Sequence, residues 1–440
     1  MKKQLLTVFL LGAAVANAQF WTPKATGFTT ASRGIDDISI VDDNVVWVKA
    51  YDGSGAGNQA IKDFSRSTDG GNTWMPGTAV LGLGTANSGL SSLSAVSATT
   101  AWLSAYPTAS NNAGQGVWKT TDGGATWTKQ TTASFSGASS FANFVHFWNA
   151  NDGVAQGDPE GGYFEIYTTS NGGTTWTRVP SANIPAPLSA SEYGYVHNLD
   201  VVGDTIWFGT SLGRLYKSTD KGMTWTVSQT PISDFGGATE SGNYTFSDEN
   251  KGLMNNSSGQ LWNTNDGGVT WNPMIPTGVF GNNDIEYIPG TTMVVSSGGA
   301  TGYGSYYSLD DGATWQIAEE NTQFTTIEFL NNMTGFAGGF NTNATTGGIF
   351  KYTGTQLPVA GFNRELFSVY PNPTSGILNV SGTSVRSVLV ADLAGKTVLK
   401  QNFGSVDNPS VDLGSLQSGV YVATILNAAG EAKAIKIVKQ

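Results

Sequence analysis

Residues 67–74 read STDGGNTW, and this octapeptide decides the fold because near-copies of it recur along the chain. The five further copies are TTDGGATW (120–127), TSNGGTTW (169–176), STDKGMTW (218–225), TNDGGVTW (264–271) and SLDDGATW (308–315). Successive tryptophans are 53, 49, 49, 46 and 44 residues apart. A period of this size suits one four-stranded blade of a β-propeller.

The residue types of the octapeptide explain why it repeats. The side chain at its third position can accept backbone N–H groups across a tight turn, glycine permits positive φ, and the hydroxyls bond local backbone. These third residues are Asp69, Asp122, Asn171, Asp220, Asp266 and Asp310. The closing residues, which should pin each turn to its blade, are Trp74, Trp127, Trp176, Trp225, Trp271 and Trp315. We expect structural roles for all twelve.

The octapeptide resembles the Asp-box, or BNR, repeat of all-β propellers. Apolar strands precede and follow each copy, for example at 116–120 and 126–130, so the box should join the third and outer strands of a blade. Segments 145–157 and 327–339 fit an inner strand, a tight turn and a second strand. In repeat style the chain is most similar to the propellers of the photosystem-II assembly-factor-like group.

Blade counting predicts seven, with six as the alternative. Residues 324–353 repeat the blade pattern without an octapeptide or an outer strand. Residues 20–24 (FWTPK) resemble the strand after a box, and Trp21 lies 53 residues before Trp74. The N-terminal strand should therefore complete the last blade and close the ring, which removes exposed sheet edges.

The first 18 residues are typical of a signal peptide. Lys2 and Lys3 precede an apolar run from 5 to 15, and small residues stand at Ala16 and Ala18. Removal of two lysines takes the formal charge from −11 to −13, which disfavours nucleic acid as a partner. No later run is long enough to insert in a membrane. There is no cysteine, and we predict neither a metal site nor a cofactor.

After a polar linker at 354–365, residues 366–440 form a second domain. Segments 366–380, 388–400 and 416–425 alternate apolar and polar residues, which predicts a small immunoglobulin-like β-sandwich. These segments closely resemble the type A C-terminal sorting domain of type IX secretion in the Bacteroidetes. The resemblance implies export through the periplasm to the cell surface or the medium, with the secretion machinery as a partner of residues 366–440. A substrate-binding sandwich is the alternative.

A polar ring is predicted in the central channel. The residues just before the centres of the seven inner strands align as Ser39, Ser94, His146, His197, Thr245, Glu286 and Glu328. The two histidines would lie in neighbouring blades and face Glu286 and Glu328. Such a ring could hold waters, a cation or a polar ligand, and the alternative is hydrogen bonding between blades.

A second cluster contains Asp158, Glu160 and Glu165, with Glu192 in the following long loop. Asp158 and Glu192 could act as acid and base in glycoside hydrolysis if about 5–10 Å apart. Solvated loop carboxylates are the alternative.

Two functions remain open. A sialidase is disfavoured, because the few propeller arginines do not provide the three that would bind a substrate carboxylate. The leading hypothesis is a non-catalytic module that binds or adheres to a glycan or a surface protein, and the rival is a polysaccharide-active glycoside hydrolase or lyase.

Overall fold

The computed structural model describes residues 20–56, 60–82, 88–108, 114–298, 302–354, 367–382, 384–392, 396–427 and 432–440. The predicted signal peptide, and the predicted linker beyond Gly354, lie outside these residues. The chain divides into two compact units, Met1–Gly354 and Thr355–Gln440. Apart from one 3-10 turn, η1 (Ser181–Asn183), the regular elements of the described residues are all β-strands, as the sequence predicts.

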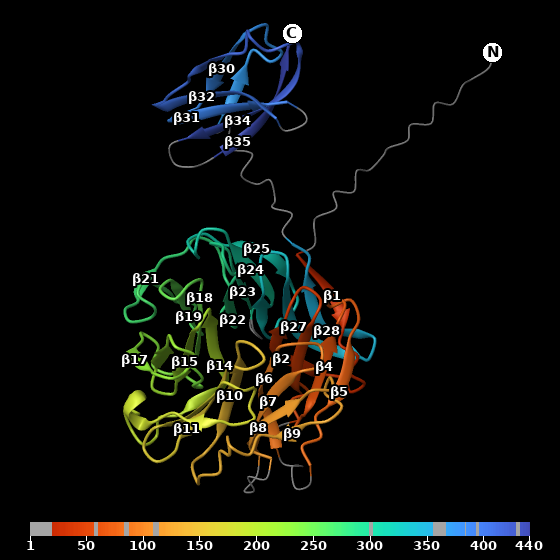
Figure 1. Cartoon of the computed structure of the whole chain (residues 1–440), viewed down its shortest axis with the longest axis vertical. Helices are drawn as coiled ribbons and strands as arrows, with labels where there is room; N and C mark the ends of the chain where they lie inside the picture. Colours follow the sequence, from red (N-terminus) through yellow and green to blue (C-terminus); the bar gives the residue numbers. More distant parts are fainter. Residues whose placement is uncertain are drawn as a thin grey trace, which may run out of the picture. The chain divides into compact units, whose positions relative to one another are not determined.

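The first unit is a β-propeller with its four-stranded sheets around a centre (Figure 1). Five sheets are separate four-stranded antiparallel meanders, which we number blades 2 to 6. Their strands are β6 (Ser88–Ala95), β7 (Ala101–Pro107), β8 (Gly116–Thr120) and β9 (Thr128–Lys129); β10 (Ala142–Phe147), β11 (Gly153–Pro159), β12 (Phe164–Thr169) and β13 (Thr177–Arg178); β14 (Gly194–Val202), β15 (Thr205–Thr210), β16 (Arg214–Ser218) and β17 (Thr226–Gln229); β18 (Gly242–Phe246), β19 (Gly252–Asn256), β20 (Leu261–Thr264) and β21 (Asn272–Met274); and β22 (Asp284–Tyr287), β23 (Val294–Ser297), β24 (Gly304–Ser308) and β25 (Gln316–Glu320).

An eight-stranded sheet closes the ring. One half, which we number blade 1, contains β2 (Arg33–Ile40), β3 (Val46–Asp52), β4 (Asp63–Ser67) and β5 (Met75–Thr78). The other half, blade 7, contains β26 (Ile327–Phe329), β27 (Gly335–Asn343), β28 (Thr346–Tyr352) and β1 (Trp21–Ala25). The halves meet at the single pair Gly34 and Phe340. This division favours seven blades over six, and the count remains a prediction.

The N-terminal strand completes the last blade, which confirms the predicted closure. β1 pairs antiparallel with β28, with Trp21 opposite Tyr352. Trp21 is fully buried, and its indole Nε1 donates to Ser305 Oγ of blade 6 at 2.8 Å. The first and last described segments of the propeller therefore form one sheet.

Each octapeptide forms the turn between the third and fourth strands of its blade. In the first copy, Asp69 Oδ1 accepts the N–H groups of Asn72 and Thr73 at 3.0 and 2.8 Å. The indole of Trp74 donates to Gly71 O at 3.1 Å. These contacts confirm the bonding expected of this turn. In the third copy, Asn171 Oδ1 still accepts the N–H of Thr175 at 2.9 Å.

The second glycine of each octapeptide fits the turn against the preceding blade. In the second copy, Gly123 has φ +75° and Gly124 has φ +89°. A Cβ on Gly124 would lie 2.2 Å from the Phe64 ring of blade 1. The first glycine is less constrained, because Lys221 and Asp311 occupy that position with φ of 58° and 57°. Packing between blades thus explains why the second position is glycine in all six copies.

The hydrophobic cores of the propeller lie between adjacent blades. One cluster joins Phe144 and Ile166 of blade 3 to Ile206, Phe208 and Trp225 of blade 4. Another joins Phe336 and Ile349 of blade 7 to strands of blade 1. Because each blade is buried on both faces by its neighbours, the ring is held mainly by apolar packing.

The second unit has two antiparallel sheets that share one core. The smaller sheet contains β29 (Ser368–Tyr370), β30 (Ile377–Ser381) and β33 (Ser410–Asp412). The larger, in spatial order, contains β32 (Thr397–Val406), β31 (Val385–Ala391), β34 (Gly419–Asn427) and β35 (Ala432–Lys439). Leu378 and Val411 of the first pack with Val388 and Ile425 of the second. The unit is a small β-sandwich, and its immunoglobulin-like classification remains a prediction.

Candidate functional site

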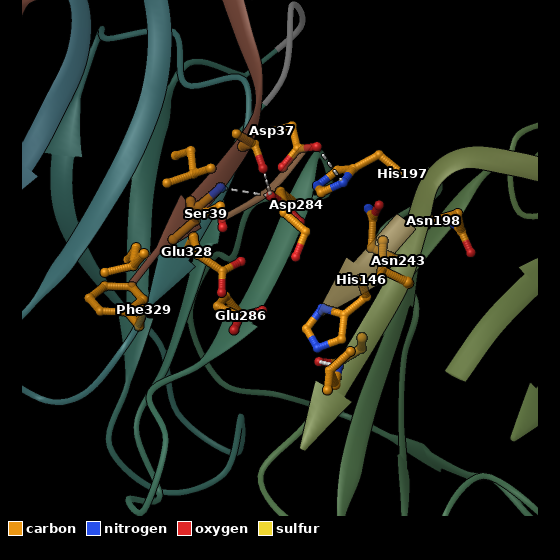
Figure 2. Close-up of a pocket in the computed structure, with 18 of the residues that line it drawn as sticks. Asp37, Ser39, His146, His197, Asn198, Asn243, Asp284, Glu286, Glu328 and Phe329 are labelled. Carbon is orange, nitrogen blue, oxygen red and sulfur yellow. Dashed lines mark hydrogen bonds and ion pairs between the residues drawn. The ribbon is translucent and has the colours of Figure 1, made fainter. Parts of the chain in front are cut away.

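The first strand of every blade lines a central cavity of about 530 Å³. Lining residues come from β2, β6, β10, β14, β18, β22 and β26. Figure 2 shows the polar side chains that these strands direct into the space. Because strand side chains alternate between faces, residues two apart on one strand share the channel side. The cavity therefore has polar groups at more than one level, for example Asp37 and Ser39 on β2.

Many of these polar groups tie neighbouring blades together. On the inner strands, a short hydroxyl side chain accepts a backbone N–H from the next inner strand, and three carboxylates do the same. The hydroxyl bonds are Ala95 N to Ser39 Oγ, Phe147 N to Ser94 Oγ and Tyr287 N to Thr245 Oγ1, each at 2.9 Å. The carboxylate bonds are Leu93 N to Asp37 Oδ2, Phe246 N to Asp200 Oδ2 and Ile327 N to Asp284 Oδ2, at 2.6, 2.5 and 2.8 Å. For these residues, hydrogen bonding between blades accounts for the polar side chain.

Three predicted ring residues accept no backbone N–H from a neighbouring blade within the described part of the chain. The carboxyl group of Glu328 makes no hydrogen bond there, and Glu286 Oε2 accepts only the hydroxyl of Thr245, at 3.3 Å. The His146 ring packs edge-on against Trp148, with centroids 4.8 Å apart. Figure 2 shows all three side chains directed into the cavity. They are the polar ring members left for a ligand.

The predicted alignment was wrong for blade 4. Trp47 and Trp102 pair with Ser39 and Ser94, and the equivalent Trp207 pairs with Asp200, so Asp200 and not His197 occupies the ring position. An irregularity between Gly194 and Leu199 shifts the register of β14, and His197 lies within it at φ 51°. The bulge inserts residues before the strand centre, which simple counting from the pattern cannot detect.

His197 nevertheless contributes to the channel. Its Nδ1 lies 3.2 Å from Asp37 Oδ2, so this pair links blade 4 to blade 1 across the cavity. Asp37 is almost fully buried and also accepts the N–H of Leu93. Burial alone lowers the pKa of His197, but the Asp37 carboxylate outweighs it and the pKa is raised. His197 and Asp37 therefore form a cross-channel ion pair.

Raised pKa values favour the neutral forms of three carboxyl groups of the channel, those of Glu286, Glu328 and Asp200. Burial, followed by the charges of Glu328 and Asp200, holds the pKa of Glu286 well above its usual value. Burial and the charges of Asp200 and Asp37 do the same for the pKa of Glu328. Burial raises the pKa of Asp200 to about 7 and lowers that of His146 to about 4. At neutral pH the ring can thus donate as well as accept hydrogen bonds.

Sequence reasoning missed the carboxylates of the second level, Asp37 and Asp284. Each lies two residues before a predicted ring residue, so the two-residue period of a strand was a signal that could have found them. The described residues contain no group of three or more His, Asp or Glu side chains arranged to hold a metal ion.

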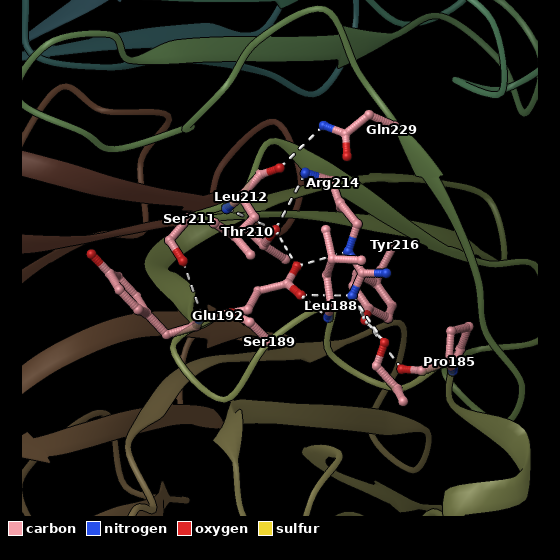
Figure 3. A network of polar contacts seen from close by, with 12 residues as sticks. Pro185, Leu188, Ser189, Glu192, Thr210, Ser211, Leu212, Arg214, Tyr216 and Gln229 are labelled. Atoms are coloured by element: carbon pink, nitrogen blue, oxygen red, sulfur yellow. Dashed lines mark hydrogen bonds and ion pairs between the residues drawn. The ribbon is translucent and has the colours of Figure 1, made fainter.

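The predicted catalytic pair is divided between two separate hydrogen-bond networks. Glu192 is 1% exposed, and its Oε1 and Oε2 accept from Arg214 Nε and Nη2 at 2.9 and 2.7 Å (Figure 3). Thr210 Oγ1 and the N–H of Leu188 also donate to it, both at 2.6 Å. A carboxylate with this many buried donors is held ionised and in place, which favours a structural role over proton transfer.

Asp158 differs from Glu192 because it is only partly buried. Its Oδ1 accepts Asn143 Nδ2 at 2.8 Å and the N–H of Gly194 at 3.0 Å, which ties the end of β11 to the start of β14. Burial raises the pKa of Asp158 to about 6. Of the two predicted acid–base residues, only Asp158 keeps a carboxyl group that could exchange a proton near neutral pH.

Comparison with known proteins identifies the second unit. Residues 368–440 match the family described as the secretion system C-terminal sorting domain. A search of curated proteins found no match. The second unit is therefore a type IX secretion sorting domain, and the protein is exported to the cell surface or secreted. No helix of the described residues is long and apolar enough to cross a membrane.

Solved structures similar to the chain are propellers. YCF48 bound to a D1 peptide has a TM-score of 0.52 at 20% identity, covering 77% of this chain and 98% of its own. YCF48 from Cyanidioschyzon merolae has a TM-score of 0.53 at 18% identity, covering 76% and 98%. The GH74 enzyme of Niastella koreensis scores 0.44 at 15% identity, covering 92% and 66%. The YCF48 likeness confirms the propeller fold, in agreement with the resemblance to photosystem-II assembly factors.

Proposed function

We propose that this exported propeller is a non-catalytic binding module whose channel receives part of a glycan or of a protein at the cell surface. The observation that carries the proposal is the separation of roles in the polar ring. Ser39, Ser94, Thr245 and Asp200 bond to neighbouring blades. His146, Glu286 and Glu328 line the same cavity, and within the described residues their side chains accept no backbone N–H from another blade.

The chemistry of these free groups suits a ligand rich in hydrogen-bonding groups. Polar side chains taken out of water lose hydrogen bonds, and a ligand that restores those bonds gains affinity. Neutral carboxyl groups can donate to sugar hydroxyls or peptide carbonyls, and they can ionise beside a bound cation. Because one of the similar propellers is YCF48 bound to a D1 peptide, peptides belong among the ligands to test.

Binding by the full mature chain should be screened against surface glycans and peptides, and then repeated with Glu328→Leu. Since the side chain of Glu328 makes no hydrogen bond among the described residues, this variant should fold normally and bind at least tenfold more weakly. Glu249→Leu, at an exposed loop position, is the matched control and should bind as the wild type does. Equal affinity of all three proteins for every ligand found would remove the channel from the proposal.

A glycoside hydrolase or lyase is the second candidate, because burial raises the pKa of Asp158 to about 6. The burial of Glu192 against Arg214 removes its predicted partner. If the screen detects product formation and Asp158→Asn abolishes it, the catalytic function replaces the binding one.

A further inference from the structure

The larger sheet of the sorting domain has two edge strands, β32 and β35, and they differ in whether another segment of the unit covers them. An edge strand presents backbone N–H and C=O groups on its outer side, and an added strand can pair with them. Natural proteins usually cover such edges or interrupt them with charges, prolines or bulges. The two edges can therefore be compared by what covers each of them within this unit.

The β35 edge is covered by the loop after β29. Asn372 Oδ1 accepts the N–H of Val438 at 2.9 Å, and Asn372 Nδ2 donates to Lys436 O at 2.8 Å. The N–H of Thr374 donates to Val438 O, and the N–H of Gln440 donates to Thr374 O, each at 2.9 Å. The YPNPT segment at 370–374 thus occupies the outer side of the last strand.

The β32 edge has no such cover within the described part of this unit. Its only strand partner is β31, and no described side chain hydrogen-bonds to the backbone between Thr397 and Val406. The strand has ten residues with no proline, and Lys400 is its one charged residue. Val398 and Val406 are 37% and 43% exposed. Register irregularities lie near both ends, between Thr397 and Leu399 and between Asn402 and Val406, where Gly404 has φ 81°. The middle of the strand, from Leu399 to Asn402, pairs regularly with β31.

We propose that β32 is the docking edge of the sorting domain, to which an extended strand of the secretion machinery adds during export. The family match assigns export to residues 368–440, so the machinery is the partner that this unit must meet. In strand addition, main-chain hydrogen bonds hold the added strand at the sheet edge, and side-chain contacts give selectivity. The covered β35 edge leaves β32 as the side of the larger sheet where a strand can add. This inference is independent of the ligand of the propeller.

Two proline variants of the full chain, Lys400→Pro and Gln401→Pro, test the proposal in a bacterium with type IX secretion. Neighbouring residues of a strand point their N–H groups to opposite sides, so one proline removes a bond to β31 and the other removes only an outward group. Thermal melting identifies the variant that loses only an outward N–H group, because this variant should unfold at the same temperature as the wild type. We expect this edge-blocking variant to show at least tenfold less protein outside the cell and to accumulate in the periplasm.

Lys400→Ala and Gln401→Ala are the matched controls, because they change the side chain and keep the backbone N–H. Both should be exported like the wild type. Normal export of the edge-blocking proline variant, or an equal loss in its alanine control, would refute strand addition.

If both proline variants melt early, hydrogen exchange of the wild-type chain decides. Amides of β32 should become protected when the chain is mixed with detergent-extracted secretion machinery, while those of β35 stay as they were. Unchanged exchange of β32 contradicts the proposal. Protection of β32 in the chain alone, together with a dimer in solution, would assign the edge to a second copy and overturn it as well.

Discussion

Asp200 links two blades by a hydrogen bond, although its burial disfavours the ionised form of its carboxyl group. It accepts the N–H of Phe246 from the next blade, and burial raises its pKa to about 7. The alignment of the inner strands by sequence pattern chose His197 in place of Asp200. The irregularity in β14 adds residues to the strand, so counting along the chain no longer gives the position in the sheet. The irregularities that precede Ser39, Ser94 and His146 are shorter, so counting along the pattern still reaches the residue before the strand centre.

A pH dependence follows from the raised pKa of Asp200. An unfolded aspartate has a pKa near 3.9, so protonation of Asp200 favours the folded state, fully below about pH 4 and progressively less as the pH rises to about 7. Asp200→Asn keeps an acceptor for Phe246 and removes this titration. We expect the variant to gain about 4 kcal/mol over the wild type between pH 4 and pH 8, because each unit of pKa shift corresponds to about 1.4 kcal/mol. Urea unfolding at these pH values measures the difference, and parallel stability curves would contradict it.

At the scale of the element, the octapeptide turn was the part best predicted from the sequence. Its hydrogen bonds are local, and a local bond depends only on residue type and spacing. Asp69, Thr73 and Trp74 therefore make the contacts expected of them. The ion pair of Glu192 could not be foreseen, because Glu192 lies in the loop before β14 and its partner Arg214 lies 22 residues further on, at the start of β16.

Truncation of a closing tryptophan should destabilise the propeller. Trp225 is 6% exposed, packs edge-on against Phe208 and donates to Gly222 O at 2.9 Å. Trp225→Ala should cost about 3–5 kcal/mol, since it leaves a cavity between blades. Met223→Ala in the same turn is the control, because Met223 is 55% exposed and should change stability by less than about 0.5 kcal/mol. Chemical unfolding of both variants checks this, and equal losses would be evidence against the interblade role of the tryptophan.

At the scale of the whole molecule, the ring depends on β1, the first described strand of the chain. The sequence predicted this closure because residues 20–24 repeat the strand that follows an octapeptide. It predicted polar side chains in the channel but not the pairs that they form across it, because those pairs arise only when strands from different blades converge. Asp37 and His197 are 160 residues apart in sequence and 3.2 Å apart in the fold.

A chain that begins at residue 26, compared with one that begins at residue 19, should have an open ring. The deletion takes away β1, leaves the edge of β28 unpaired and removes buried Trp21 from its core. We expect a lower melting temperature and concentration-dependent association through the exposed edge. Light scattering and thermal melting measure both. A deletion variant that stays monomeric and melts like the full chain would show that β1 does not hold the ring closed.

The central claim is that the channel, and not the outer rim, receives the ligand. The most direct measurement is a crystal structure of the chain from residue 19 onward with the tightest ligand from the screen. We predict that ligand atoms lie within hydrogen-bond distance of at least two of His146, Glu286 and Glu328. A ligand bound only at the perimeter, with the channel side chains unchanged, would contradict the account.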